Sequence, residues 1–437
     1  MTSSPPQRLD RKAFADCMAR FEPFEAQPHI AVACSGGPDS LALAVLADAW
    51  AGARMGRVTA LIVDHGLRPE AAHEAASTRK RLAQLGIRAA VLTGTVDAPA
   101  RDVQNAARDL RYRLLQDWCA ARRVLHLLVA HHREDQAETL LLRLGRGSGV
   151  DGLAAMAPET MLNHVRILRP LLQVPKAHLQ AVARQAAGTF VEDASNRDLA
   201  FARVRVRRLQ PALAAEGLTV ERLAATAARM GRARSALEQA VNALLGAAVG
   251  IYPSGYCRIA PQPLAAAPDE IALRALSRIV ACISGAAHPP RLDRLERLHA
   301  ALCDGRLGRG RTLGGVRVME WQDAVLAVRE AAAMAPPVRL TGQVLWDGRY
   351  SAETVAPGWS LGALGSAGAA QMAKRDAGSQ TAPPRVVWPT LPAFWRRGQP
   401  RVVPHLGVSA PKRGRAESLR VVHTPKRPLG STIFNFS

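Results

Sequence analysis

Short apolar runs alternate with longer helix-like segments between Pro28 and Leu172. The first apolar run is uninterrupted by charge, as in a strand covered on both faces. The runs that predict strands are 29–34, 58–63, 88–93 and 124–129. The segments that predict helices between them are 39–50, 70–85 and 104–121. This rhythm is typical of βαβ units and predicts an α/β domain with a doubly wound, mostly parallel sheet.

Beyond this region the pattern favours helices. A helix is expected up to about Ala187, a long alanine-rich helix over 220–249, and another over 269–282. Strands of a small terminal domain are expected near 317–321. We therefore predict a mainly helical domain and then a small α+β domain. The expected domains are an N-terminal extension (1–27), the α/β domain (28–215), the helical domain (216–331) and the C-terminal domain (332–437).

Two C-terminal stretches lack periodicity. Residues 362–385 are rich in Gly, Ala, Ser and Pro, which predicts a flexible insertion or linker. The tail beyond residue 400 is basic, with Glu417 as a single acid, and could be either a solvated end or an RNA contact. Gly308–Gly310 imitates part of a dinucleotide fingerprint, but no strand precedes it, so we interpret it as a loop.

The charge composition predicts a binding partner for the protein. The 437 residues carry a formal net charge of +22, with 58 basic residues against 36 acidic ones. A GC-rich genome would explain arginine in place of lysine but not this excess, so a polyanion such as nucleic acid is expected. Because aromatic residues make up only 4%, arginine contacts with the shape and backbone of a folded RNA fit better than base stacking.

The cysteine spacing and the N-terminal sequence exclude further classes of protein. Six cysteines at wide spacing form no C-x-x-C pair, so neither a zinc site nor an iron–sulfur cluster is indicated. No apolar run is long enough to cross a membrane, and the N-terminus lacks a hydrophobic signal core. We expect a cytoplasmic protein with no membrane partner; its oligomeric state stays open, with a homodimer as one option.

Ser35–Ser40 is the most informative stretch of the chain. Its sequence, Ser-Gly-Gly-Pro-Asp-Ser, lies between a predicted strand and a predicted helix. A glycine-rich turn at a helix N-terminus binds anions through free N–H groups and the helix dipole. The lysine of the common phosphate loop is absent, which argues against a γ-phosphate site. The alternative is an ordinary glycine-rich turn.

Two further strand ends carry polar residues: Asp64 with His65, and the stretch His131–Thr139. Carboxyl ends of parallel strands lie at one edge of a sheet, so we expect all three to converge. Asp39 and Asp135 could then hold Mg²⁺ beside a triphosphate. Helix capping is the alternative for each acid. Asp135 and Glu138 share a helix face suited to a cationic substrate, unless they only compensate the helix dipole.

Ordered motifs across residues 30–210 carry a resemblance to a known family. They are the loop Ser35–Ser40 and the stretches Val63–Arg68, Asn105–Tyr112, His131–Thr139, Arg143–Leu153, Arg169–Leu172 and Glu192–Arg197. The loop resembles that of the N-type ATP pyrophosphatases, or PP-loop proteins. The whole set resembles the bacterial tRNA(Ile)-lysidine synthetases, whose catalytic domain would have the adenine nucleotide alpha hydrolase-like fold.

The resemblance implies a two-step ligation. ATP would adenylate the C2 oxygen of the wobble cytidine in a tRNA(Ile) with a CAU anticodon, releasing pyrophosphate. The amine of L-lysine would then displace AMP, so that the tRNA reads AUA. The implied cofactors are ATP and Mg²⁺, with L-lysine as co-substrate. The helical and C-terminal domains would contact the tRNA.

Residue roles follow from the same motifs. The ATP-binding residues would be Ser35, Gly36, Gly37, Pro38, Asp39, Ser40, Asp64 and His65. The catalytic residues would be Asp39, Arg111, His131 and Asp135, with Asp39 and Asp135 also near the metal. Lysine or tRNA would be held by Glu138 and by an arginine among Arg203, Arg205 and Arg207.

One departure and two alternatives stay open. Glu134 stands where the family often has aspartate, which would change the geometry if position 134 ligated the metal. A related PP-loop tRNA thiolase is the first alternative, although it generally needs paired thiols. A non-catalytic basic RNA-binding protein is the second, against which the intact loop argues.

Overall fold

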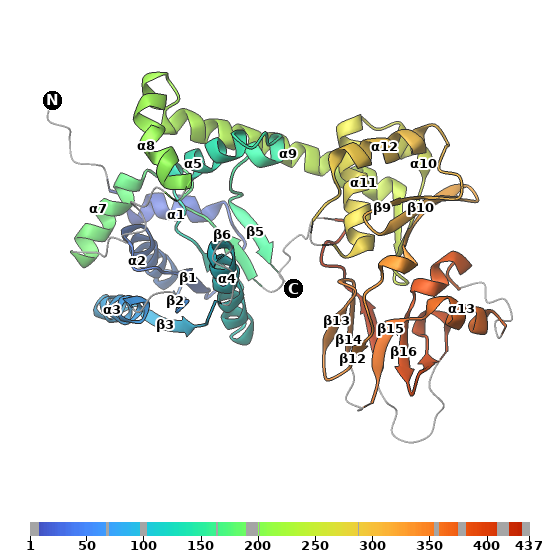
Figure 1. Ribbon diagram of the computed structural model, residues 1–437. Coiled ribbons are helices and arrows are strands. Elements are labelled where there is room, and N and C mark those ends of the chain that lie inside the picture. Colours follow the sequence, from blue (N-terminus) through green and yellow to red (C-terminus); the bar gives the residue numbers. More distant parts are fainter. Residues whose placement is uncertain are drawn as a thin grey trace. The chain divides into compact units, whose positions relative to one another are not determined.

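The computed structural model describes residues 8–66, 70–96, 103–162, 165–188, 200, 202–286, 288–353, 358–374, 382–408 and 419–430. The chain divides into two compact units, Met1–Ser235 with Phe434–Ser437, and Ala236–Ile433 (Figure 1). Helix α9 (Val220–Ala248) runs across this division. Within the described ranges, no helix is both long enough and apolar enough to cross a lipid bilayer.

The first unit contains a six-stranded sheet in the order β3-β2-β1-β4-β6-β5. Its strands are β1 (His29–Ala33), β2 (Arg57–Asp64), β3 (Arg88–Thr93), β4 (His126–Leu128), β5 (Glu159–Leu162) and β6 (Val165–Leu168). All pairings are parallel except that of β5 with β6. The predicted doubly wound, mostly parallel sheet is thus confirmed.

Helices surround this sheet (Figure 1). They are α1 (Arg11–Ala19), α2 (Pro38–Gly52), α3 (Glu70–Gln84), α4 (Val103–Ala121), α5 (Arg133–Leu144), α6 (Val150–Leu153), α7 (Lys176–Ala187) and α8 (Ala202–Ala215). Helix α2 is apolar on most of its surface, so it lies buried in the core. The predicted N-terminal extension contains α1, whose Phe14 and Met18 are buried in the same core.

The strand order explains where ligands can bind. The chain runs outward from β1 through β2 to β3 and then returns to place β4 on the other side of β1. Such a reversal opens a crevice beyond the carboxyl ends of the two adjacent strands. The loop after β1 and the loop after β4 therefore meet at the same edge of the sheet.

The second unit consists of antiparallel sheets and helices. Its first sheet, in the order β7-β8-β11-β10-β9, contains β7 (Val249–Tyr252), β8 (Tyr256–Ile259), β9 (Arg311–Leu313), β10 (Val316–Trp321) and β11 (Ala324–Arg329). The accompanying helices are α10 (Pro261–Ala265), α11 (Asp269–Ser284) and α12 (Leu292–Cys303). The helices expected over 220–249 and 269–282 are confirmed as α9 and α11. Residues 216–331 were predicted to be mainly helical. They contain these helices and also the five strands β7 to β11.

Two smaller sheets follow, in the orders β12-β15-β16-β17 and β13-β14-β18. Their strands are β12 (Val338–Arg339), β13 (Val344–Trp346), β14 (Tyr350–Glu353), β15 (Ser360–Ala363), β16 (Pro392–Arg396), β17 (Gln399–Val402) and β18 (Arg420–His423). Short 3₁₀ turns lie at η2 (Ala331–Ala333), η3 (Arg385–Thr390) and η4 (Pro404–Leu406). The boundaries predicted at residues 215 and 331 stay predictions.

One expectation for this region is wrong in part. Residues Gly365–Ala373 form helix α13, where the sequence predicted a segment without regular structure. Alanine has the highest helix propensity, and Met372 packs in the core beside Trp388, so tertiary contacts stabilise a helix whose sequence lacks clear amphipathicity. Residues 375–381 and 409–418 of the predicted insertion and tail lie outside the described ranges. Gly308–Gly310 lies in a loop, as predicted.

Candidate nucleotide-binding and catalytic site

The glycine-rich loop lies between β1 and α2, as predicted. Gly36 has φ +83°, and a Cβ added there would lie 2.3 Å from Thr78 Oγ1, so only glycine fits. Pro38 begins the helix at a position where its missing N–H costs no hydrogen bond. Ser40 Oγ donates to the carbonyl oxygen of Gly37 (2.9 Å) and accepts from the N–H of Ser35 (3.2 Å). The first turn of α2 is thereby held in the geometry of an anion-binding site.

A cavity of about 300 Å³ opens beside this loop, at the carboxyl ends of β1, β2 and β4. The predicted site residues that line it are Ser35, Gly37, Asp39, Ser40, His65, Arg111 and His131. The expected convergence of three strand ends is thus observed. Asp64 is not part of the lining; its Oδ1 accepts the N–H of Gly66 at 3.0 Å and shapes the turn.

Other lining residues were missed from the sequence. Glu74 and Thr78 come from α3, and Arg108 and Tyr112 from α4. Arg108 and Tyr112 lie in the Asn105–Tyr112 motif, and their spacing with Arg111 on one helix could have suggested a shared face. Nothing in the local pattern marks Glu74 or Thr78, because only the packing of α3 beside the loop brings them to the cavity.

His132 is the centre of an acidic cluster next to the loop. Its Nε2 lies 3.6 Å from Asp39 Oδ2 and 3.5 Å from Asp135 Oδ2, and its Nδ1 lies 3.0 Å from Glu134 Oε2. Burial alone would lower the pKa of His132, but the hydrogen bond with Glu134 and the charges of Asp135 and Asp39 raise it overall. For Asp39 the effect of burial has the other sign: burial raises the pKa of this carboxyl group, although the charge of His132 opposes the shift. The charges of His132 and of the surrounding carboxylates therefore influence one another.

Glu134 has a positioning role in this cluster. Its two carboxylate oxygens accept the backbone N–H of Lys176 at 3.1 and 3.0 Å, where α7 begins. Burial raises its pKa, but the hydrogen bonds that the carboxylate accepts from His132 and from backbone N–H groups, together with the charge of His132, lower the pKa overall. Glu134 thus joins the starts of α5 and α7 and orients His132. The longer side chain at this position has partners that do not require a metal.

Asp39 and Asp135 are the carboxylates that would suit a magnesium ion. Asp39 Oδ1 is buried without a hydrogen-bond partner among the described residues. Within the same part of the chain, no group of three or more His, Cys, Asp or Glu side chains is assembled to hold a metal ion. Two carboxylates suit Mg²⁺, which commonly completes its shell with phosphate and water oxygens. The donors present therefore fit a metal that arrives with a nucleotide.

The buried Glu138 and the half-buried Arg207 form an ion pair beside this cluster. Glu138 is only 1% exposed, and it accepts from Nε and Nη2 of Arg207 on α8. Burial raises the pKa of Glu138 although Arg207 opposes the shift. Arg207 Nη2 also lies 3.9 Å from Asp135 Oδ1. Of the three arginines predicted to contact lysine or tRNA, Arg207 therefore reaches the acids.

The other two arginines lie differently. Arg205 donates to the carbonyl oxygen of Ala200 at 2.8 Å, and Arg203 is exposed. Burial lowers the pKa of His131 to about 3; Asp135 opposes this shift, and the charges of Arg169, Arg203 and Arg108 add to it. His131 is therefore neutral near pH 7. Its Nδ1 has no hydrogen-bond partner within the described ranges, so it can serve a ligand in the cavity.

Known proteins are similar to this chain over most of its length. Residues 10–213 match the family model described as a PP-loop domain. A tRNA(Ile)-lysidine synthase from a Bradyrhizobium species is 40% identical over 350 residues, covering 75% of this chain and 96% of that protein. A tRNA(Ile)-lysidine synthase from Methylobacterium nodulans is 43% identical, covering 70% and 92%. One from Ruegeria pomeroyi is 38% identical, covering 79% and 82%.

Proposed function

This chain belongs to the tRNA(Ile)-lysidine synthase family, and we propose that it joins L-lysine to C2 of the wobble cytidine in a tRNA(Ile) with a CAU anticodon. The C2 oxygen first attacks the α-phosphorus of ATP; pyrophosphate leaves, and AMP stays bound to the base. The lysine amine then attacks C2 and displaces AMP. The modified tRNA reads AUA.

One observation carries the proposal: the glycine-rich loop, the His132 cluster and the Glu138–Arg207 pair lie in succession around one edge of the sheet. Asp39 belongs to the loop and also lies against His132, while Asp135 connects His132 to Arg207. An anion-binding turn next to carboxylates suits a reaction that uses both ATP and a cationic amino acid.

The loop supports the first step. Free N–H groups in the first turn of α2 can stabilise the negative charge that grows on the departing pyrophosphate. Asp39 and Asp135 are the residues that would hold Mg²⁺, which screens the triphosphate when bound. Arg111 adds positive charge at the cavity wall. His131, being neutral, suits a hydrogen bond to the ribose or the base better than charge neutralisation.

The acidic residues support the second step. Glu138 and Asp135 offer carboxylates to a cationic amino acid, and an incoming ammonium group would compete with Arg207 for them. The nucleophilic amine must lose its proton before it attacks. A carboxylate whose pKa is raised by burial, as that of Glu138 is, accepts a proton more readily than an exposed one.

The test is incorporation of radiolabelled lysine into a tRNA(Ile) transcript with a CAU anticodon. We expect incorporation that depends on ATP and is lost when the wobble cytidine is replaced. A folded protein that binds ATP and this tRNA but transfers no lysine would contradict the proposal. A thiolated nucleoside in the product would instead indicate the thiolase alternative, for which the six cysteines, all free thiols, offer little support.

The variant Glu138→Gln tests the proposed lysine-binding role of Glu138 in the same assay. We expect a higher KM for lysine because the side chain loses its negative charge but keeps its shape. Glu221→Gln is the matched control: Glu221 also pairs with an arginine, Arg133, but on an exposed surface. The cytoplasmic location and the homodimer stay predictions of the sequence.

A further inference from the structure

Cys303, the last residue of α12, differs from the other cysteines of the chain because its side chain is exposed. The other five thiols are partly or fully buried, namely Cys17, Cys34, Cys119, Cys257 and Cys282. Burial raises the pKa of each of these five, that of Cys119 to about 12 and that of Cys282 to about 11. They are therefore poor nucleophiles, because the thiolate is the reactive form of cysteine.

An imidazole ring lies next to the exposed thiol. His299 precedes Cys303 by four residues, so the two side chains share one side of α12. Cys303 Sγ lies 3.4 Å from His299 Nε2, which is a hydrogen-bond distance for sulfur. Only 8% of His299 is exposed, so the surrounding packing holds the ring beside the thiol. A nucleophile and a base are thus already in contact.

The other ring nitrogen faces a carboxylate. His299 Nδ1 lies 4.0 Å from Oδ1 of Asp269, at the start of α11, although Asp269 is 89% exposed and contributes little. His299 also lies in the last turn of α12, where the helix dipole stabilises a cation. Both features favour a proton that arrives on His299.

The remaining charges near the pair come from the elements that pack against α12, which are α10, α11 and β9. Helix α10 has no titratable side chain. Apart from Asp269, the charged groups at this end of α12 are Glu296, Asp304, Arg306, Arg311 and the Glu270–Arg274 pair. The acids among them stabilise a protonated imidazole but oppose a free thiolate. The proton of Cys303 should therefore leave during its attack and not beforehand.

We propose that Cys303 and His299 form a site that reacts with low-molecular-weight disulfides such as oxidised glutathione. The sulfur of Cys303 attacks one sulfur of the disulfide while its proton moves to His299 Nε2. The S–S bond of the small molecule breaks, a mixed disulfide forms on Cys303, and the departing thiolate takes the proton from His299. One thiol and one disulfide yield one thiol and one disulfide, so the exchange needs no further oxidant.

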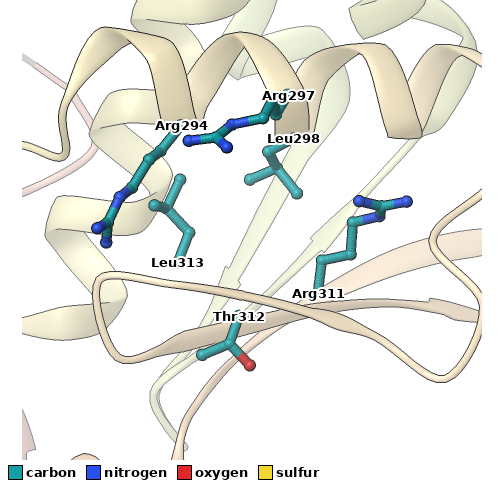
Figure 2. A pocket seen from close by; sticks show the side chains of 6 residues that line it. All are labelled: Arg294, Arg297, Leu298, Arg311, Thr312 and Leu313. Atoms are coloured by element: carbon teal, nitrogen blue, oxygen red, sulfur yellow. The ribbon is translucent and has the colours of Figure 1, made fainter.

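The opposite side of α12 supplies a control position. There α12 and β9, which forms a hairpin with β10, border a cleft of about 510 Å³. Figure 2 shows its lining residues, which are Arg294, Arg297, Leu298, Arg311, Thr312 and Leu313. We call this feature the α12–β9 cleft. Nine residues, or about two and a half turns, separate Arg294 from Cys303, so the two side chains face opposite sides of the helix.

The test is the reaction of the folded full chain with oxidised glutathione, followed by intact mass and peptide mapping. We expect one glutathione per chain, attached to Cys303, and none in Cys303→Ser. The variant His299→Gln should react about tenfold more slowly at pH 7, where an unassisted thiol is only a few per cent thiolate. Arg294→Gln and His288→Gln, which change exposed residues of the same unit, should react as the wild type does.

The pH dependence separates proton transfer from a change in packing. Without a base, the rate follows the thiolate fraction and rises about tenfold per pH unit below the pKa of a thiol. The wild type should rise less steeply, because the imidazole removes the proton where thiolate is scarce, and His299→Gln should regain the full slope.

Three results would overturn the proposal: no glutathione on Cys303, equal modification of another cysteine in the folded protein, or equal rates and slopes in the wild type and His299→Gln. If His299→Gln does not fold, the slope of the wild type decides, and a tenfold rise per pH unit would exclude assistance by His299. The reaction is measured without ATP, lysine or tRNA, so its outcome is independent of the proposed ligation.

Discussion

The cavity beside the glycine-rich loop and the α12–β9 cleft use charge in opposite ways. In the cavity region, acids and bases are paired and are buried or half-buried, as in the cluster around His132 and in the Glu138–Arg207 pair. In the cleft, arginines of one sign stand in water. Burial strengthens each interaction and shifts protonation, whereas water and salt weaken exposed charges. The first arrangement suits chemistry, and the second suits reversible binding of a polyanion.

The largest effect is expected from Asp39→Ala. Asp39 connects the loop to the His132 cluster, and its Oδ1 is free to meet a ligand or a metal within the described part of the structure. Pyrophosphate release should fall by about 10² to 10³ or more, while tRNA affinity stays nearly unchanged. Asp48→Ala, on the same helix but away from the cavity, should retain activity. Equal loss of activity and tRNA binding in Asp39→Ala would mean that Asp39 is structural.

Gly36→Ala tests the loop through its backbone. The left-handed φ and the close Thr78 hydroxyl should cost about 1 to 3 kcal/mol of unfolding free energy and weaken ATP binding. Gly52→Ala, at the other end of α2 with open space around it, should be neutral or stabilise by about 0.4 to 1 kcal/mol. Denaturant unfolding and ATP titration measure both effects. A Gly36→Ala protein as stable as the wild type would show that the loop can relax.

His131→Asn tests the consequence of burying a titratable group. The pKa of His131 is lowered to about 3 in the folded state from 6.5 for an unperturbed histidine, so between these pH values the unfolded chain binds a proton that the folded chain does not. Stability should therefore fall as pH falls through this window, by up to about 1.4 kcal/mol per pH unit. His131→Asn should reduce that slope, and His73→Asn, at an exposed position on α3, should not. Identical slopes for all three proteins would exclude a neutral, buried His131.

Asp293→Asn should give the smallest effect, because it acts on the exposed side of the comparison. Loss of the pair with Arg297 should change the unfolding free energy by no more than about 0.5 kcal/mol. Removing a negative charge next to the cleft should tighten tRNA binding by about twofold at low salt. Asp304→Asn, which breaks the pair with Arg306 outside the cleft lining, is the control. Weaker tRNA binding by Asp293→Asn would contradict the expectation that the charge of this region attracts a polyanion.

Local pattern was sufficient for much of the first unit. Buried parallel strands are uniformly apolar and their helices are long, so the βαβ rhythm predicted β1 to β4 and α2 to α4 close to their observed bounds. The order of these elements also predicted which strand ends would meet, because a doubly wound sheet has one crevice. The second unit was harder, since short antiparallel strands such as β7 and β9 have few residues over which a period can be recognised.

The partners of individual charged side chains required the three-dimensional fold. Arg203, Arg205 and Arg207 look alike in sequence, and only the packing of α8 against α5 selects Arg207 for Glu138. The sequence left open whether Glu134 ligates a metal, and only the fold shows that its carboxylate accepts the N–H of Lys176 at the start of α7. The α12–β9 cleft likewise joins residues from a helix and a hairpin. Periodicity is a property of neighbours along the chain, whereas ion pairs and clefts depend on distances between segments that the sequence does not state.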